Sequence, residues 1–106
     1  MDFMRIRNIT TAELAQKLTT QSLTILDIRT KALYEAGHIP GAINVPYEVV
    51  QNGGYLPTVQ PTYIVCQGSI ESKLATTTLT KQGYDVVNVL RGMDYWHGPQ
   101  NKGPKP

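Results

Sequence analysis

The chain has 106 residues, of which 41% are hydrophobic and 17% charged, and its formal net charge is +2. This length predicts one domain with a core that needs no disulfide or structural metal. The small net charge and the scattered basic residues argue against nucleic-acid binding, and no apolar run approaches the roughly 18 residues of a membrane span. We expect the domain to occupy residues 1–98, with residues 99–106 as a flexible tail.

The chain contains a single cysteine, Cys66. It cannot form an internal disulfide, and the first residues lack the apolar core of a signal peptide, so we expect a reducing, cytoplasmic location. We expect no cofactor and no metal, because His38 and His97 lack partner ligands at a suitable spacing. We also expect a monomer or a weak dimer.

Predicted strands and helices alternate along the first half of the chain. Residues 4–9 predict a short edge strand, and Thr10 with Glu13 forms a capping box at the start of a helix that runs to about residue 18. Residues 23–28 form an apolar run typical of a buried strand. Residues 31–36 predict a short helix that Gly37 stops.

The alternation continues in the second half. We predict strands at 42–46, 63–65 and 85–90, a helix at 72–82, a last helical turn at 93–96, and a flexible loop at 51–54. Leu74, Ala75 and Leu79 are expected to form the buried face of the 72–82 helix, with Tyr95 and Trp96 closing the core.

This order of elements predicts an α/β fold, with a mostly parallel five-stranded sheet flanked by helices on both faces. Functional sites in such sheets lie at the carboxyl ends of the strands. Two segments meet that description here. One carries Asp27 and Arg29 after the 23–28 strand, and the other is Cys66 with the loop that follows it.

The position of Cys66 favours a reactive thiolate. Backbone N–H groups of a tight loop and the N-terminus of a helix both stabilise an anion there. The loop consists of Gln67, Gly68, Ser69, Ile70 and Glu71, and Ser72 follows as a candidate helix cap or a partner of the sulfur acceptor. Glu71 opposes the thiolate if it points inward, because two charges about 6 Å apart repel by about 3 kcal/mol at an effective dielectric of about 20. We expect Glu71 to point outward.

Two long segments resemble a known family. Residues 26–29 with 34–46 resemble the first signature of rhodanese-like sulfurtransferase domains, and 83–90 followed by Gly92 and Trp96 resembles the family's closing strand and last helix. The resemblance implies a small α/β domain in which Cys66 is the nucleophile. Such a cysteine takes sulfane sulfur from thiosulfate or another donor, holds it as a persulfide and passes it to a thiophilic acceptor. The resemblance also implies that Asp27 and Arg29 shape the pocket.

The loop departs from the family pattern. The family usually places glycine at the fourth loop position and a basic residue or threonine at the sixth, where this chain has Ser69 and Glu71. The second position, often arginine, is Gln67. The loop therefore carries one carboxylate and no cation, and Lys73 or Arg29 is the candidate for a compensating charge. A further departure is Arg91, which stands where the family often has glycine.

Three functions remain open at this point. The first is a sulfurtransferase or persulfide carrier that uses Cys66, with a small-molecule or protein-bound sulfur donor and a thiol acceptor. The second is a non-catalytic interaction module, in which Cys66 is a buried small hydrophobe. The third, a phosphatase or arsenate reductase, is disfavoured because no arginine lies between Cys66 and Arg91.

Two side-chain roles are also open. Asp27 and Arg29 either shape the pocket or form a structural pair. His38 is interpreted as a turn residue that bonds backbone groups, because a thiolate that forms a persulfide needs no general base.

Overall fold

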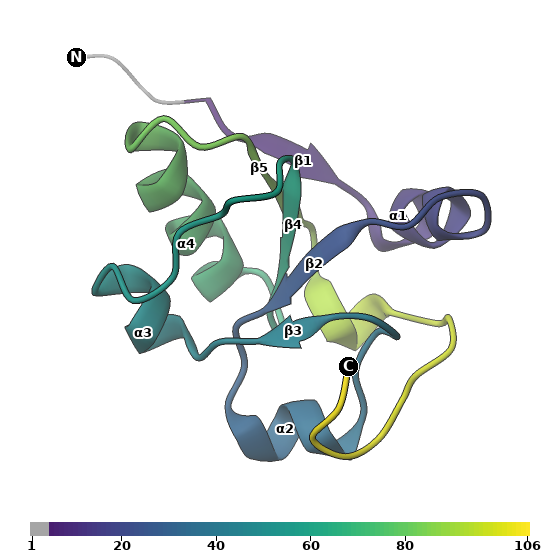
Figure 1. The fold of residues 1–106 in the computed structure, drawn as a ribbon. Helices are drawn as coiled ribbons and strands as arrows, with labels where there is room; N and C mark the ends of the chain where they lie inside the picture. The colour runs from purple at the N-terminus through teal and green to yellow at the C-terminus, as the bar shows by residue number, and fades with distance from the viewer. Residues whose placement is uncertain (1–4) are drawn as a thin grey trace.

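The computed structural model describes residues 5–106, which form a five-stranded parallel sheet with helices on both faces (Figure 1). The strands are β1 (Arg7–Ile9), β2 (Thr24–Asp27), β3 (Ile43–Asn44), β4 (Thr62–Val65) and β5 (Val86–Val89). Their order is β1-β5-β4-β2-β3, and every neighbouring pair is parallel. The predicted fold class is confirmed, and β1 is an edge strand as expected; Met4, which the prediction included in that strand, lies outside the described residues.

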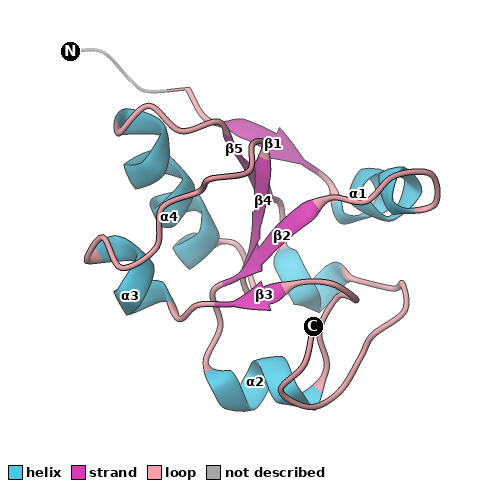
Figure 2. Ribbon diagram, viewed as in Figure 1, coloured by secondary structure: helices cyan, strands magenta, loops and turns pink. Residues whose placement is uncertain are grey.

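Within residues 5–106, four α-helices and one 3₁₀ turn surround the sheet. They are α1 (Thr11–Leu18), α2 (Lys31–Ala36), α3 (Tyr47–Gln51), α4 (Ile70–Lys81) and η1 (Gly92–Tyr95). Figure 2 shows α3 and α4 on one side of the sheet and α1 on the other. None of the helices within residues 5–106 has the length and apolar character needed to cross a membrane.

The sheet separates two hydrophobic cores because successive side chains of a strand point to opposite faces. From β4, Tyr63 and Val65 enter the core that contains Leu14 of α1. Ile64 and Cys66 enter the other core, which α3 and α4 cover. The alternation along β4 therefore turns the Cys66 side chain toward α4.

The helix starts follow local rules that the sequence displays. The Thr10 hydroxyl accepts a hydrogen bond from the Glu13 N–H at 3.0 Å, and the Glu13 carboxylate accepts one from the Thr10 N–H at 3.0 Å, which confirms the capping box. Helix α2 has the predicted bounds, with Thr30 as its N-cap and Gly37 after its end.

Helix α3 was not predicted from the sequence. It has five residues, carries two adjacent valines of low helix propensity, and overlaps at Gln51 the segment predicted as a flexible loop. Its Val50 is 1% exposed in the core beneath α4. Tertiary burial, and not propensity, therefore accounts for this helix.

Helix α4 differs from its prediction at two points. It begins at Ile70 and not at Ser72, and Leu74, expected to be inward, is 48% exposed. Ala75 and Leu79 are buried as predicted, and the buried face also contains Ser72 and Thr76. Ser72 and Thr76, and not Leu74, therefore pack against the sheet beside Ala75 and Leu79.

The last residues contact the domain. The backbone of Asn101 exchanges two hydrogen bonds with that of His38, both at 2.9 Å, and the Gly103 N–H donates to Glu35 O at 2.8 Å. The Trp96 indole N–H donates to Pro99 O at 2.9 Å. The prediction of a flexible tail at residues 99–106 did not include the bonds to His38 and Glu35, because composition carries no information about a backbone partner more than 60 residues away.

Candidate active site

Cys66 directly follows the central strand β4 and is 2% exposed. Its Sγ accepts a hydrogen bond from the backbone N–H of Ser72 at 3.3 Å. Ser72 lies in the first turn of α4, where backbone N–H groups have no acceptor within the helix. The sulfur thus meets the positive end of a 12-residue helix.

Ser72 is not the helix cap that the sequence suggested. The N-cap is Ser69, and its side chain makes no capping hydrogen bond. Ser72 is buried, and its hydroxyl donates to the backbone oxygen of Ser69 at 3.3 Å. Ser72 is the third residue of α4, and its N–H, which has no acceptor within the helix, bonds the sulfur.

On its other side the loop is bound by η1. The N–H groups of Met93 and Asp94 donate to the backbone oxygens of Cys66 and Gln67, both at 2.9 Å. Gly92 has a φ of +51°, and a β-carbon there would lie 2.0 Å from the Cys66 oxygen. Glycine is therefore required at residue 92 for the chain to approach Cys66 this closely.

Arg91, before this glycine, also has a positive φ, of 63°. Its guanidinium lies over the Tyr95 ring at 4.8 Å and donates to the Tyr95 hydroxyl at 2.9 Å. Tyr95 is 49% exposed, so its expected role in closing the core is wrong, whereas Trp96 is 5% exposed and belongs to the core. The cation of Arg91 is thus engaged with an exposed ring.

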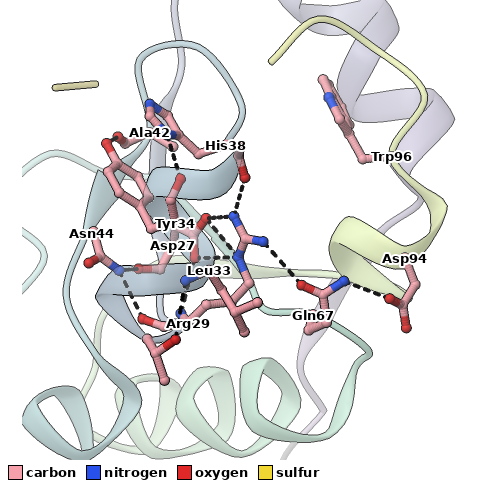
Figure 3. A network of polar contacts seen from close by, with 12 residues as sticks. Asp27, Arg29, Leu33, Tyr34, His38, Ala42, Asn44, Gln67, Asp94 and Trp96 are labelled. Carbon is pink, nitrogen blue, oxygen red and sulfur yellow. Dashed lines mark hydrogen bonds and ion pairs between the residues drawn. The ribbon is translucent and has the colours of Figure 1, made fainter. Parts of the chain in front are cut away.

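Asp27 and Arg29 form a buried ion pair at the end of β2 (Figure 3). The guanidinium bonds the Asp27 carboxylate through Nε and Nη2 and donates to Gly37 O at 2.7 Å. Nη1 donates to the Gln67 side-chain oxygen at 3.0 Å. The structural reading of this pair fits these contacts, and Arg29 also reaches the loop. Its charge is balanced by Asp27, so it is not a free cation for an anionic donor.

Gln67 continues this network toward η1. Its side-chain nitrogen donates to Asp94 Oδ1 at 2.6 Å (Figure 3). Arg29, Gln67, Gly37 and Met93 also line a shallow pocket of about 200 Å³ beside the loop. Asp94 could not be identified from the sequence, because no local pattern relates it to a residue 27 positions earlier.

Glu71 and Lys73 are both exposed on the first turns of α4. Within residues 5–106, Glu71 forms neither an ion pair nor a side-chain hydrogen bond, which agrees with the expected outward orientation. Its neighbour Ile70 is 76% exposed. The surface around the loop therefore presents a solvated carboxylate and an apolar side chain.

His38 is fully buried, with Nδ1 2.8 Å from the Tyr34 backbone oxygen. Its ring stacks on that of Tyr34, with centroids 3.8 Å apart. Burial, and to a smaller extent the charge of Asp27, raises the pKa of Tyr34. The Tyr34 hydroxyl therefore stays protonated and donates a hydrogen bond to Ala42 O. These contacts fit a turn residue and not a general base.

No group of three His, Cys, Asp or Glu side chains within residues 5–106 is arranged to hold a metal ion.

The fold and the site define a class of protein. Residues 10–99 match the family described as rhodanese-like domain, and the chain belongs to that family. A crystal structure of a rhodanese-like domain protein from Staphylococcus aureus superposes with a TM-score of 0.79 at 33% identity, covering 89% of this chain and 93% of that one. The family resemblance noted in the sequence is confirmed.

Individual relatives carry more specific names. A putative sulfur carrier protein of Bacillus subtilis (strain 168) is 40% identical over 80 residues, which are 74% of this chain and 43% of that protein. A thiosulfate sulfurtransferase of Shewanella oneidensis is 32% identical over 93 residues, which are 86% of this chain and 92% of that enzyme. The chain spans 60% of a second Bacillus subtilis relative and 18% of an adenylyltransferase and sulfurtransferase of Meyerozyma guilliermondii. Several of these relatives are thus much longer than the part that this chain matches.

Proposed function

We propose that this protein transfers sulfane sulfur through a persulfide on Cys66. One observation carries the proposal: Cys66 directly follows the central strand, and its Sγ accepts a hydrogen bond from the Ser72 N–H at the start of α4. That placement stabilises an anion on sulfur, and the thiolate is the nucleophilic form of cysteine. The names of the bacterial relatives, a putative sulfur carrier and a thiosulfate sulfurtransferase, point to the same chemistry.

The reaction proceeds in two displacements. In the first, the Cys66 thiolate attacks the outer sulfur of a donor such as thiosulfate, a bond forms between the two sulfur atoms, and sulfite leaves with the electron pair of the broken S–S bond. In the second, an acceptor thiolate or cyanide attacks the outer sulfur of the persulfide, and the Cys66 thiolate leaves. The charge is conserved in each step, and no redox cofactor is required.

The remaining components belong to the same proposal. The donor is a small molecule or a protein-bound persulfide, the acceptor is a thiol, and the loop of Gln67, Gly68, Ser69, Ile70, Glu71 and Ser72 binds the sulfur anion. Asp27 and Arg29 support that loop. A reducing, cytoplasmic location suits a chain whose single cysteine must stay free, and we propose a monomer or a weak dimer.

Intact-mass spectrometry tests the proposal directly. The protein is incubated with thiosulfate, or with polysulfide, and desalted. We expect a gain of one sulfur atom, which an acceptor thiol removes, and we expect no gain in Cys66→Ser. The absence of any gain with either donor, in folded protein, would exclude sulfur transfer through Cys66.

That negative result would favour the second candidate, a non-catalytic interaction module. Two observations support this alternative: Glu71 places a carboxylate in a loop that has no cation, and Asp27 neutralises the nearby Arg29. The two functions thus make opposite predictions in a single measurement.

A further inference from the structure

We propose that Gln67 is a positioning residue, which ties the sulfur-holding loop to β2 on one side and to η1 on the other. Its side chain is the bridge between Arg29 and Asp94 in Figure 3. The catalytic part of this role rests on the proposed function, whereas the mechanical part can be measured without it.

The bridge requires an amide side chain. The Gln67 oxygen accepts from Arg29 Nη1 at 3.0 Å, and the Gln67 nitrogen donates to Asp94 Oδ1 at 2.6 Å. Glutamate would repel Asp94, and arginine would repel Arg29. Glutamine alone combines the donor and the acceptor in one group of this length, so the two contacts also determine the orientation of its amide.

Both ends of the bridge are anchored. Arg29 is 6% exposed and is held by the Asp27 carboxylate and by Gly37 O. Asp94 donates its own backbone N–H to the Gln67 backbone oxygen at 2.9 Å. Main chain and side chain of Gln67 therefore bond the same residue, which forms a closed ring that opposes rotation of the loop.

This ring orients the peptide groups after Cys66. The backbone oxygens of Cys66 and Gln67 both face η1, where the Met93 and Asp94 N–H groups bind them. In a trans peptide the N–H points opposite to the carbonyl oxygen, so the N–H groups of Gln67 and Gly68 point away from η1. Fixed in this way, they are available to an anion held within the loop.

Amide hydrogen exchange measures the mechanical part. In Gln67→Met, which preserves the length of the side chain and removes both bonds, we expect exchange roughly three- to tenfold faster at the amides of Ser72, Met93 and Asp94. The amides of β4 should accelerate less than these three, and the melting temperature should fall by at most a few degrees, because the lost bonds also stabilise the folded state. Gln16→Met, on the exposed surface of α1, is the matched control. Asp94→Asn retains an oxygen acceptor for Gln67, and its exchange should stay close to that of the wild type.

Sulfur-transfer kinetics measure the catalytic part. In Gln67→Met we expect kcat to fall by a factor similar to the exchange effect, with KM for a neutral donor changed less than twofold, because no donor contact is removed. Gln16→Met should preserve kcat with that donor.

Unchanged exchange at the three amides, or a uniform increase over the whole sheet, would overturn the positioning role. Equal loosening by Asp94→Asn would also overturn it, because the charge of Asp94 and not the bridge would then hold the loop. Faster local exchange in Gln67→Met, together with no sulfur uptake by the wild type, would support the positioning role of Gln67 and exclude the proposed function.

Discussion

Gly92 lies against the backbone of Cys66 so closely that a β-carbon at residue 92 would be 2.0 Å from the Cys66 oxygen. The Met93 N–H donates to that same oxygen at 2.9 Å. Cys66 thus sits between two helical N-termini, with its sulfur bonded by α4 and its carbonyl oxygen by η1. Replacement of Gly92 should therefore disturb the site and the fold together.

We predict that Gly92→Ala lowers the free energy of unfolding by more than about 2 kcal/mol, since the positive φ alone costs about 1–2 kcal/mol and the contact with Cys66 adds to it. Urea unfolding measures the change. Gly83→Ala is the matched control, because Gly83 also has a positive φ, of +93°, but no heavy atom within 4 Å of its added β-carbon. An equal loss of unfolding free energy in the two variants would show that the close approach to Cys66 does not contribute to the cost of the substitution.

The charge of Glu71 should weaken thiosulfate binding. Because Glu71 is exposed, screening limits the effect, and we predict that Glu71→Arg lowers KM for thiosulfate about two- to fivefold, with a smaller gain in Glu71→Gln. Steady-state kinetics at low and high salt provide the measurement, and the gain should shrink as salt increases. Gln82→Arg, at the opposite end of α4, controls for net charge. A KM that is unchanged or higher in folded Glu71→Arg would contradict this electrostatic argument.

The native protein should prefer a donor that carries less negative charge than thiosulfate. Arg29 is neutralised by Asp27, and Glu71 is a solvated carboxylate, so a dianion such as thiosulfate gains little attraction near the loop. We predict a several-fold higher kcat/KM for a donor of lower negative charge, such as an alkyl persulfide or a protein-bound persulfide, than for thiosulfate. Single-turnover transfer to Cys66 from each donor compares them, and equal rates, or faster transfer from thiosulfate, would refute the preference.

The capping box of α1 should make stability depend on pH. Donation by the Thr10 backbone N–H, together with the Thr10 hydroxyl and the charge of Lys17, lowers the pKa of Glu13. A carboxyl whose pKa is lower in the folded state stabilises the fold above its unfolded-state pKa, and this contribution disappears as the pH falls through the folded-state value. We predict that the wild type exceeds Glu13→Gln in stability at neutral pH and that the difference shrinks on acidification. Urea midpoints measured over that range test the sign; a constant difference would contradict it.

Much of the fold was predictable because its signals are local. The capping box at Thr10, the bounds of α2 and the strand that ends directly before Cys66 depend on residues within a few positions of one another, and all are present in the structure. Helix α3, the early start of α4 and the exposure of Leu74 were not predicted, because each depends on what the rest of the sheet leaves open for packing. The bonds between Asn101 and His38 belong to the same group.

The sequence by itself determined the α/β alternation, the membership of the family and the position of the one cysteine at the end of a strand, because periodicity, caps and motifs are properties of neighbouring residues. Only the tertiary structure decided which groups surround that cysteine. Strand order brings β2 beside β4, and so places Arg29 against Gln67, while the chain after β5 brings Gly92 and Asp94 to the same loop. The side-chain contacts of Gln67 join residues that lie 27 and 38 positions apart in the sequence. Burial of the whole sheet, and not a local conformational preference, brings such residues together.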